Sequence, residues 1–166
     1  VFENCRLPAD ALLGEENKGF YAVMQNFQNE RLIIAAMAVG ESLHALELTR
    51  RYVKDRPAFG GTLWDKQTIR QRLSMLDAKV QAVRAFTYQT AWAQEQGVDT
   101  VREVSMLKAL TGELVNEVMY TCQQFHGGFG YIQDSDIERM VRDARIMSIG
   151  GGATEVMLEE VAKRYA

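Results

Sequence analysis

The sequence predicts an all-α protein folded as an up-down bundle of the four-helix type, with short extra helices at its C-terminal end. Long segments carry an apolar residue at every third or fourth position, which is the spacing of one helix face. Only two prolines occur, Pro8 and Pro57, and both lie outside these periodic segments. Glycine-rich breaks at residues 57–61, 127–130 and 150–152 divide the chain into segments of helical length. Long amphipathic helices joined by short turns pack as such a bundle.

The first long helix is expected to begin near residues 17–19 and to end at about Val53. A second helix follows the break at residues 57–61 and is expected to end near Gly97. In both helices the apolar positions alternate in steps of four and three, so that they share one face. These positions are Leu32, Ala36, Val39, Leu43 and Leu46 in the first helix, and Ile69, Leu73, Leu76, Val80 and Val83 in the second.

A third helix is expected to begin at Asp99 or Thr100, because Thr100 and Glu103 have the spacing of a capping box. It continues to the glycines of residues 127–130. Its predicted core face consists of Val104, Leu107, Leu114 and Val118.

Two shorter helices are predicted after that glycine turn. One begins at Asp134 or Ser135 and ends at about Met147, and the other begins at Thr154 after the break at residues 150–152. They are the short extra C-terminal helices of the predicted bundle.

Residues 1–8 are expected to form a short strand that ends at Pro8. The helical segments that follow offer this strand no partner, and the chain starts with Val1 rather than methionine. We therefore expect a fragment whose missing part lies on the N-terminal side. Its domains are predicted as a remnant and linker at residues 1–16 and a helical bundle at residues 17–166.

The composition excludes several classes of function. A net charge of −3, with basic residues spread along the helices, argues against a nucleic-acid-binding protein. The two cysteines and two histidines have neither disulfide nor metal-ligand spacing, so no metal site is expected and a reduced, intracellular setting is the default. We find no signal peptide and no long apolar run, so no membrane span is expected.

Residues 123–131 contain three glycines within four positions, interleaved with aromatic residues. Each glycine costs about 1 kcal/mol relative to alanine inside a helix, so the cluster predicts a bend where backbone can approach another group closely. A simple helix C-cap and turn is the alternative interpretation. No Glu-x-x-His pair predicts a di-iron bundle, and no serine, histidine and acid arrangement predicts a hydrolase.

The order of the motifs resembles the C-terminal helical domain of the FAD-dependent acyl-CoA dehydrogenases, over essentially the whole chain. Residues 12–20 are similar to that family's link from its β-domain into the helical domain. The other motifs that carry the resemblance are Glu30-Arg31, residues 35–40, Arg56-x-x-Phe59-Gly60 with Gln67, Gln124-x-x-Gly127-Gly128-x-Gly130, residues 142–145 and residues 152–156.

The resemblance implies α,β-dehydrogenation of an acyl-CoA thioester, in which a carboxylate removes the α-proton and the β-hydrogen leaves as hydride to FAD N5. Many family members carry this base just before the last Gly-Thr motif, where this chain has Gly151. An isovaleryl-CoA or long-chain-like branch instead places a glutamate before an arginine on the first long helix. The resemblance therefore implies Glu30 as the catalytic base. It implies substrate-binding roles for Gln28, Asn29, Arg31 and Gly152.

By the same resemblance, FAD is bound with help from a neighbouring subunit. Arg56 is expected to pair with the pyrophosphate, and Lys66 with Gln67 to lie at the adenine side. Ala153 departs from the family's usual threonine, so that one flavin contact is expected to be missing. The implied cofactor-binding residues are Arg56, Phe59, Lys66, Gln67, Gln124, Gly127, Gly128, Thr154 and Glu155.

The resemblance also implies partners: an electron-transfer flavoprotein or similar acceptor, and a homo-oligomer that is a dimer or a dimer of dimers. It places the protein in fatty acid metabolism, in a bacterial cytoplasm or a mitochondrial matrix. The isolated domain is expected to be inactive. Three alternatives remain open at this point: an acyl-CoA oxidase, a decarboxylating relative, and a non-enzymatic helical oligomerisation module. From local sequence alone, Glu30 also fits a solvated helix face.

Overall fold

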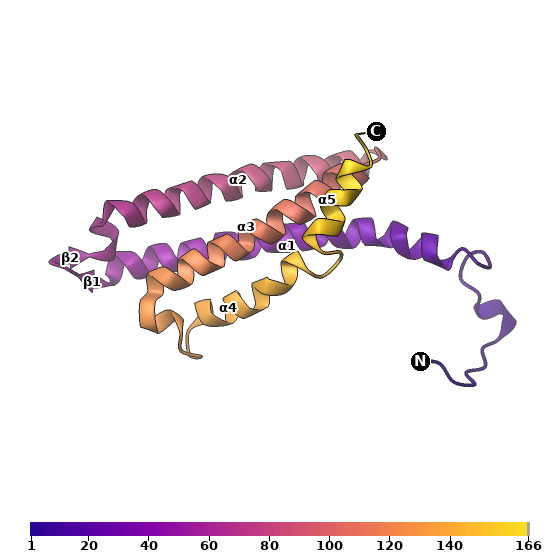
Figure 1. The fold of residues 1–166 in the computed structure, drawn as a ribbon, viewed down its shortest axis with the longest axis horizontal. Helices are drawn as coiled ribbons and strands as arrows, with labels where there is room; N and C mark the ends of the chain where they lie inside the picture. Colours follow the sequence, from indigo (N-terminus) through magenta and orange to yellow (C-terminus); the bar gives the residue numbers. More distant parts are fainter. Residues whose placement is uncertain (166) are drawn as a thin grey trace.

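The computed structural model describes residues 1–165 and is all-α apart from one small hairpin, as the sequence predicts. Helices α1 to α4 alternate in direction, and α5 crosses the N-terminal half of α3 (Figure 1). The helices are α1 Gly19–Asp55, α2 Gln67–Glu95, α3 Val101–His126, α4 Asp136–Ala144 and α5 Thr154–Ala162. Between α1 and α2, β1 (Pro57–Ala58) pairs antiparallel with β2 (Gly61–Thr62). Short 3-10 turns occupy Ala9–Ala11, Leu63–Asp65, Gly127–Gly130 and Arg145–Ser148.

Helix α3 is the centre of the bundle, since it packs against α1, α2, α4 and α5. The core faces predicted for the second and third helices are confirmed almost completely. Leu73, Leu76, Val80 and Val83 on α2 and Val104, Leu107, Leu114 and Val118 on α3 are all buried, and only Ile69 is partly exposed. A face of large apolar residues at helical spacing therefore located these two helices correctly.

The predicted core face of α1 is confirmed in part: Val39 and Leu46 are buried, and Leu32 and Leu43 are partly buried. Ala36 is exposed, whereas the neighbouring Ala35 and Ala38 are buried. Small residues allow two helix axes to approach closely, and α3 is the main packing partner of α1. The buried α1 face comprises Arg31, Ala35, Ala38, Val39, Ser42, Ala45, Leu46, Thr49 and Val53.

Two local predictions are wrong. Residues 1–8 form no strand within the described chain, because no segment of residues 1–165 lies beside them to accept and donate ladder hydrogen bonds. Their origin as a remnant of a preceding domain stays a prediction. The capping box at Thr100 is also absent: the Thr100 side chain makes no capping bond, and Asp99 Oδ1 accepts from the Val101 amide at 3.1 Å. A capping box does form at Thr62 and Asp65.

Helix α1 contains a stretch that is long and apolar enough to cross a membrane, contrary to the expectation that no such run exists. Length and composition alone are weak evidence, since core helices of soluble proteins pass the same test. Here α1 packs along α3 and α2 as a core helix. No other helix in residues 1–165 meets the test.

Candidate active site and cofactor groove

One end of the bundle carries an open groove of about 1000 Å³ between the β-hairpin and the glycine turn after α3. We call it the hairpin groove. Residues far apart in the sequence meet there, because α1 ends and α3 ends at the same side of the bundle (Figure 1). Its lining includes Tyr52, Arg56, Phe59, Gln124, Gly127 and Gly128.

The hairpin presents Phe59 to solvent in a strained conformation. Phe59 and Gly60 are the two loop residues between β1 and β2, with φ angles of 51° and 80°. Two positive φ values are typical of the tight turn that matches the twist of a hairpin, and they favour asparagine and glycine. A phenylalanine there is under backbone strain, and the residue is 90% exposed. Strain of this kind is often found at functional positions.

The glycine turn is both a helix cap and a wall of the groove. Gly127, the C-cap of α3, has a φ of 57°. Gly130 needs to be glycine for a different reason: a Cβ at that position would lie 2.7 Å from the Gln123 carbonyl oxygen. The helix C-cap interpretation of the sequence and the close-approach interpretation therefore apply to different glycines of the same turn.

Stacked rings join this turn to α1. The His126 ring stacks on Tyr52 with centroids 4.3 Å apart, and the Tyr52 hydroxyl donates to the His126 carbonyl at 3.1 Å. His126 Nδ1 bonds the Cys122 carbonyl at 2.8 Å, and burial lowers the pKa of the imidazole. His126 is therefore buried and packs against the wall of the hairpin groove.

The structure brings most of the predicted cofactor residues together. Arg56, Phe59, Gln124, Gly127 and Gly128 all line the hairpin groove. Lys66 adjoins it, since its Nζ donates to the Phe59 carbonyl at 3.3 Å and lies 5.7 Å from the ring centroid of the same residue. Gln67 is the exposed first residue of α2 and does not line the groove.

A second candidate site forms around the glycine loop, residues 149–153, which connects the Arg145–Ser148 turn to α5. The buried Arg31 side chain donates from Nε to the Gly151 carbonyl at 2.9 Å, across 120 positions of sequence. Lys108 Nζ donates to the Gly152 carbonyl. Burial lowers the pKa values of both Arg31 and Lys108. Two cations, from α1 and α3, therefore hold consecutive carbonyls of this loop.

The backbone conformation and the surroundings of position 151 both disfavour a side chain. Gly151 has a φ of 70°, and a Cβ there would lie 2.6 Å from Ile34 Cδ1. Gly152 has a φ of 117°, and its Cβ would lie 2.7 Å from the Met157 methyl carbon. Each position combines backbone that L-residues rarely adopt with space already occupied. This chain therefore holds the loop close against α1 instead of projecting a carboxylate from it.

The predicted catalytic base, Glu30, and the predicted substrate contacts do not share one face. Glu30 is exposed, and its Oε1 accepts from Asn26 Nδ2 at 2.7 Å. The Arg31 side chain points inward to the glycine loop, which contains Gly152. Asn29 instead accepts a hydrogen bond from Gln94 of α2. Gln28 is half-buried, and its Oε1 makes no hydrogen bond within residues 1–165.

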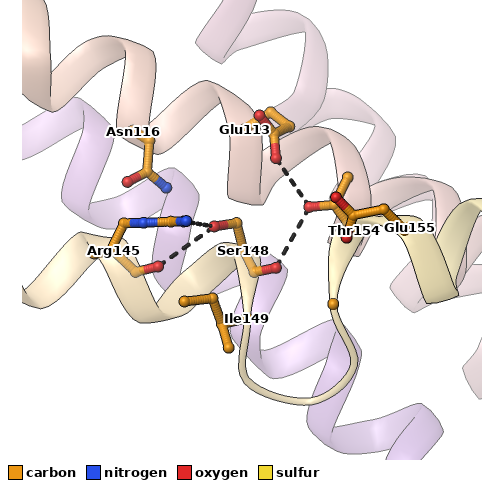
Figure 2. A pocket seen from close by; sticks show the side chains of 8 residues that line it. Glu113, Asn116, Arg145, Ser148, Ile149, Thr154 and Glu155 are labelled. Carbon is orange, nitrogen blue, oxygen red and sulfur yellow. Dashed lines mark hydrogen bonds between the residues drawn. The ribbon is translucent and has the colours of Figure 1, made fainter.

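Thr154 and Glu155 lie beside the glycine loop, away from the hairpin groove, in a pocket of about 350 Å³ (Figure 2). The Thr154 hydroxyl donates to Glu113 Oε1 at 2.9 Å. Arg145 donates to the Ser148 hydroxyl across the same pocket. Glu113, Glu155 and Arg145 all line this pocket, at the N-terminus of α5 where the resemblance implies cofactor contacts for Thr154 and Glu155.

Sequence reasoning missed Lys108 and Glu113. A signal for Lys108 was present: it lies four residues after Val104 and next to Leu107, on a helix face that is otherwise apolar or small. A lysine in such a stripe is an exception to the usual exposure of charged residues. Glu113 offered no comparable signal, since a glutamate on a helix is ordinarily solvated.

A family model and several known proteins match this chain over most of its length. Residues 17–166 match the family model described as "Acyl-CoA dehydrogenase, C-terminal domain". The chain is 45% identical over 162 residues to the mitochondrial long-chain specific acyl-CoA dehydrogenase of Sus scrofa, covering 98% of this chain and 38% of that protein. It is 33% identical over 156 residues to a subunit of the caffeyl-CoA reductase-Etf complex of Acetobacterium woodii, covering 94% and 41%.

A solved structure, that of an acyl-CoA dehydrogenase from Geobacillus kaustophilus, has a TM-score of 0.96 and 35% identity to this chain. The match covers 99% of this chain and 43% of that one. The chain thus spans less than half the length of the relatives it matches. Family match, sequence identity and fold agree: this chain belongs to the acyl-CoA dehydrogenase family, as its C-terminal helical domain.

Proposed function

We propose that this chain supplies the proton-abstracting base and part of the flavin site of an FAD-dependent acyl-CoA dehydrogenase, with Glu30 as the base. The observation that carries the proposal is the hydrogen bond from Arg31 to the Gly151 carbonyl. It brings the α1 turn that bears Glu30 against the loop where many family members carry their base. At position 151 the positive φ is unfavourable for any residue with a side chain, and a Cβ there would require Ile34 Cδ1 to move. The carboxylate is therefore supplied from the neighbouring helix.

The surface around Glu30 suits an acyl chain. On the outer face of α1, Ile33 and Met37 follow Glu30 at helical spacing and are 57% and 50% exposed. An apolar stripe with a single carboxylate can hold a hydrocarbon chain and place the base beside its α-carbon. Asn26 holds the carboxylate through Oε1, which leaves Oε2 to accept the proton.

The hairpin groove fits part of FAD. Exposed aromatic rings, an arginine and side-chain-free glycine backbone match the flat rings and pyrophosphate of a dinucleotide. A Cβ at Gly128 would meet nothing within 4 Å, so its backbone faces open space. In this proposal Arg56 binds the pyrophosphate, Phe59 packs on the cofactor, Gln124 and Gly127 approach it, and Lys66 with Gln67 lies at the adenine side. When bound, FAD supplies the oxidant that takes the β-hydrogen as hydride.

Two separate places on one chain would contact flavin, which supports a cofactor shared between subunits. Residues 30 and 56 are separated by roughly 39 Å along α1, at about 1.5 Å per residue. Thr154 and Glu155 lie at the glycine loop and would offer their oxygens to ribityl hydroxyls of one cofactor, whereas the hairpin groove would hold part of another. We therefore infer a homo-oligomer, a dimer or a dimer of dimers. An electron-transfer flavoprotein is the proposed acceptor, in a bacterial cytoplasm or a mitochondrial matrix.

A non-enzymatic oligomerisation module is less well supported. The strained, exposed Phe59 and the buried Lys108 both oppose stability. Features that reduce the stability of the fold are usually retained at functional sites. A scaffold with the same fold would need neither feature.

The test compares the complete flavin-loaded protein with its Glu30→Gln variant under anaerobic conditions. Each is mixed with a panel of acyl-CoA thioesters, and bleaching of the flavin absorbance is followed. We expect bleaching in the wild type and a loss of roughly 10²- to 10⁴-fold in rate in the variant, the usual contribution of a general base. Glu95→Gln, an exposed glutamate at the end of α2, is the matched control and is expected to bleach normally.

The outcomes separate the candidate functions. Bleaching that survives Glu30→Gln would assign the base to another residue. No bleaching with any thioester would support the non-enzymatic module, and rapid flavin reoxidation with oxygen consumption once air is admitted would support an oxidase. The isolated domain is expected to bind FAD weakly, and tight stoichiometric binding in a spectrophotometric titration would contradict that.

A further inference from the structure

Lys108 is a fully buried lysine at the centre of the bundle. It lies on α3 and has no exposed surface, and its Nζ donates to the Gly152 carbonyl. The charged groups that act on it are Arg31 from α1, Glu113 from α3 itself and Glu155 from α5. Its ammonium group therefore contacts the glycine loop from the interior of the protein.

Burial of this cation opposes folding. An ammonium group removed from water loses its hydration, and a carbonyl oxygen compensates for only part of that loss. Desolvation, followed by repulsion from Arg31, lowers the Lys108 pKa. Methionine has a similar length and no charge, and apolar residues commonly replace buried ions without loss of stability. Packing alone therefore gives no reason for a lysine at this position.

The hydrogen bond to Gly152 supplies a reason. Lys108 and Arg31 hold two consecutive carbonyls, Gly152 and Gly151, and a planar peptide has a fixed orientation once its carbonyl is held. Both glycines have positive φ, so without such bonds this stretch could adopt many conformations. The same loop faces the α1 turn that carries Glu30.

We propose that Lys108 is a positioning residue, which together with Arg31 holds the glycine loop against α1 and so sets the wall of the site beside Glu30. This inference rests on the proposed function for its effect on rate. Its effect on the loop itself is independent of that function. Lys108 acts through the Gly152 carbonyl and does not contact the substrate.

The experiment uses the flavin-loaded holoenzyme with three variants. Lys108→Met removes both charge and donor, Lys108→Gln keeps an N–H donor without charge, and Lys163→Met removes an exposed lysine after α5 as the matched control. Three quantities are measured for each: the thermal unfolding midpoint, amide hydrogen exchange of the peptide spanning residues 146–158, and the maximal rate of flavin reduction by acyl-CoA.

For Lys108→Met we expect faster exchange confined to the glycine loop, an unfolding midpoint that is unchanged or higher, and a flavin reduction rate lowered roughly 10- to 100-fold, as for loss of a positioning contact. Lys108→Gln is expected to fall between Lys108→Met and wild type. A purely structural lysine would instead lower the midpoint and raise exchange along all of α3, which would overturn the proposal.

Loop exchange and rate equal to those of Lys163→Met would also overturn it. If Lys108→Met does not fold, the loop exchange and the flavin reduction rate of Lys108→Gln decide between the two outcomes. If the wild type is not reduced by any acyl-CoA, the proposed function fails, but loop exchange still tests the hold on the glycine loop.

Discussion

The hairpin groove and the glycine loop differ in how they use polar and glycine residues. The groove is open, and Phe59 and Arg56 are exposed at its rim. The glycine loop is closed: its carbonyls at Gly151 and Gly152 are already bonded by buried cations. One region thus offers free groups to a ligand, whereas the other uses its groups to hold its own backbone. FAD affinity should therefore depend mainly on the groove, and the reaction rate mainly on the loop and the α1 turn beside it.

Both regions depart from what a stable fold requires, in different ways. The groove carries backbone strain at Phe59, and the loop site carries a buried charge at Lys108. Strain costs about 1–3 kcal/mol at such positions, and a buried ion without a full set of partners also opposes stability. Each departure can be relieved by a single substitution, which makes the two regions testable separately.

The largest effect on the groove is expected from Arg56→Ala. A hydrogen bond to a charged group contributes about 1.5–3 kcal/mol, so the dissociation constant for FAD should rise roughly 10- to 100-fold. The rate of flavin reduction in the fully loaded enzyme should stay close to that of the wild type. Fluorescence titration of the complete protein after removal of its flavin measures the first quantity, and anaerobic stopped flow of the flavin-loaded protein measures the second. A lower rate with unchanged FAD affinity would break the proposed division between the two regions.

The glycine turn allows a matched pair of substitutions, Gly130→Ala and Gly128→Ala. At Gly130 the new Cβ would meet the Gln123 carbonyl at 2.7 Å, so overpacking should lower the free energy of unfolding by about 1–3 kcal/mol. At Gly128 the Cβ would meet nothing within 4 Å, so stability should hardly change while FAD affinity falls. Chemical denaturation and FAD titration of both variants check this. If both variants lost the same free energy of unfolding, the turn would serve only as the C-terminal cap of α3.

The smallest effect is expected from Phe59→Asn. Asparagine tolerates positive φ better than phenylalanine, so relief of strain should raise the free energy of unfolding by about 1 kcal/mol. Loss of the exposed ring should weaken FAD binding at the same time. Opposite changes in stability and affinity would assign the ring a ligand-binding role. A loss of stability in the variant would contradict the strain at Phe59, and unchanged FAD affinity would contradict the ligand-binding role. Tyr88→Asn, which removes an exposed ring on α2, controls for loss of aromatic surface.

The groove was more predictable from sequence than the glycine loop. Its residues lie next to strong local signals, Pro57 with Gly60 on one side and the three glycines after α3 on the other. The loop site depends on the shifted face of α1, where small residues and Arg31 are buried in place of the predicted Leu32 and Ala36. A rule that counts only large apolar residues cannot find such a face, because close helix packing selects small ones.

The sequence by itself determined the all-α class, the long helices and the positions of their breaks, because helical spacing and glycine or proline breaks are local properties of the chain. Only the tertiary structure decided that Arg31 meets Gly151 and that Lys108 reaches Gly152. It also separated the predicted cofactor residues into two places and paired Thr154 with Glu113. Such contacts join residues more than 40 positions apart, and they depend on how helix faces pack, which no local pattern encodes.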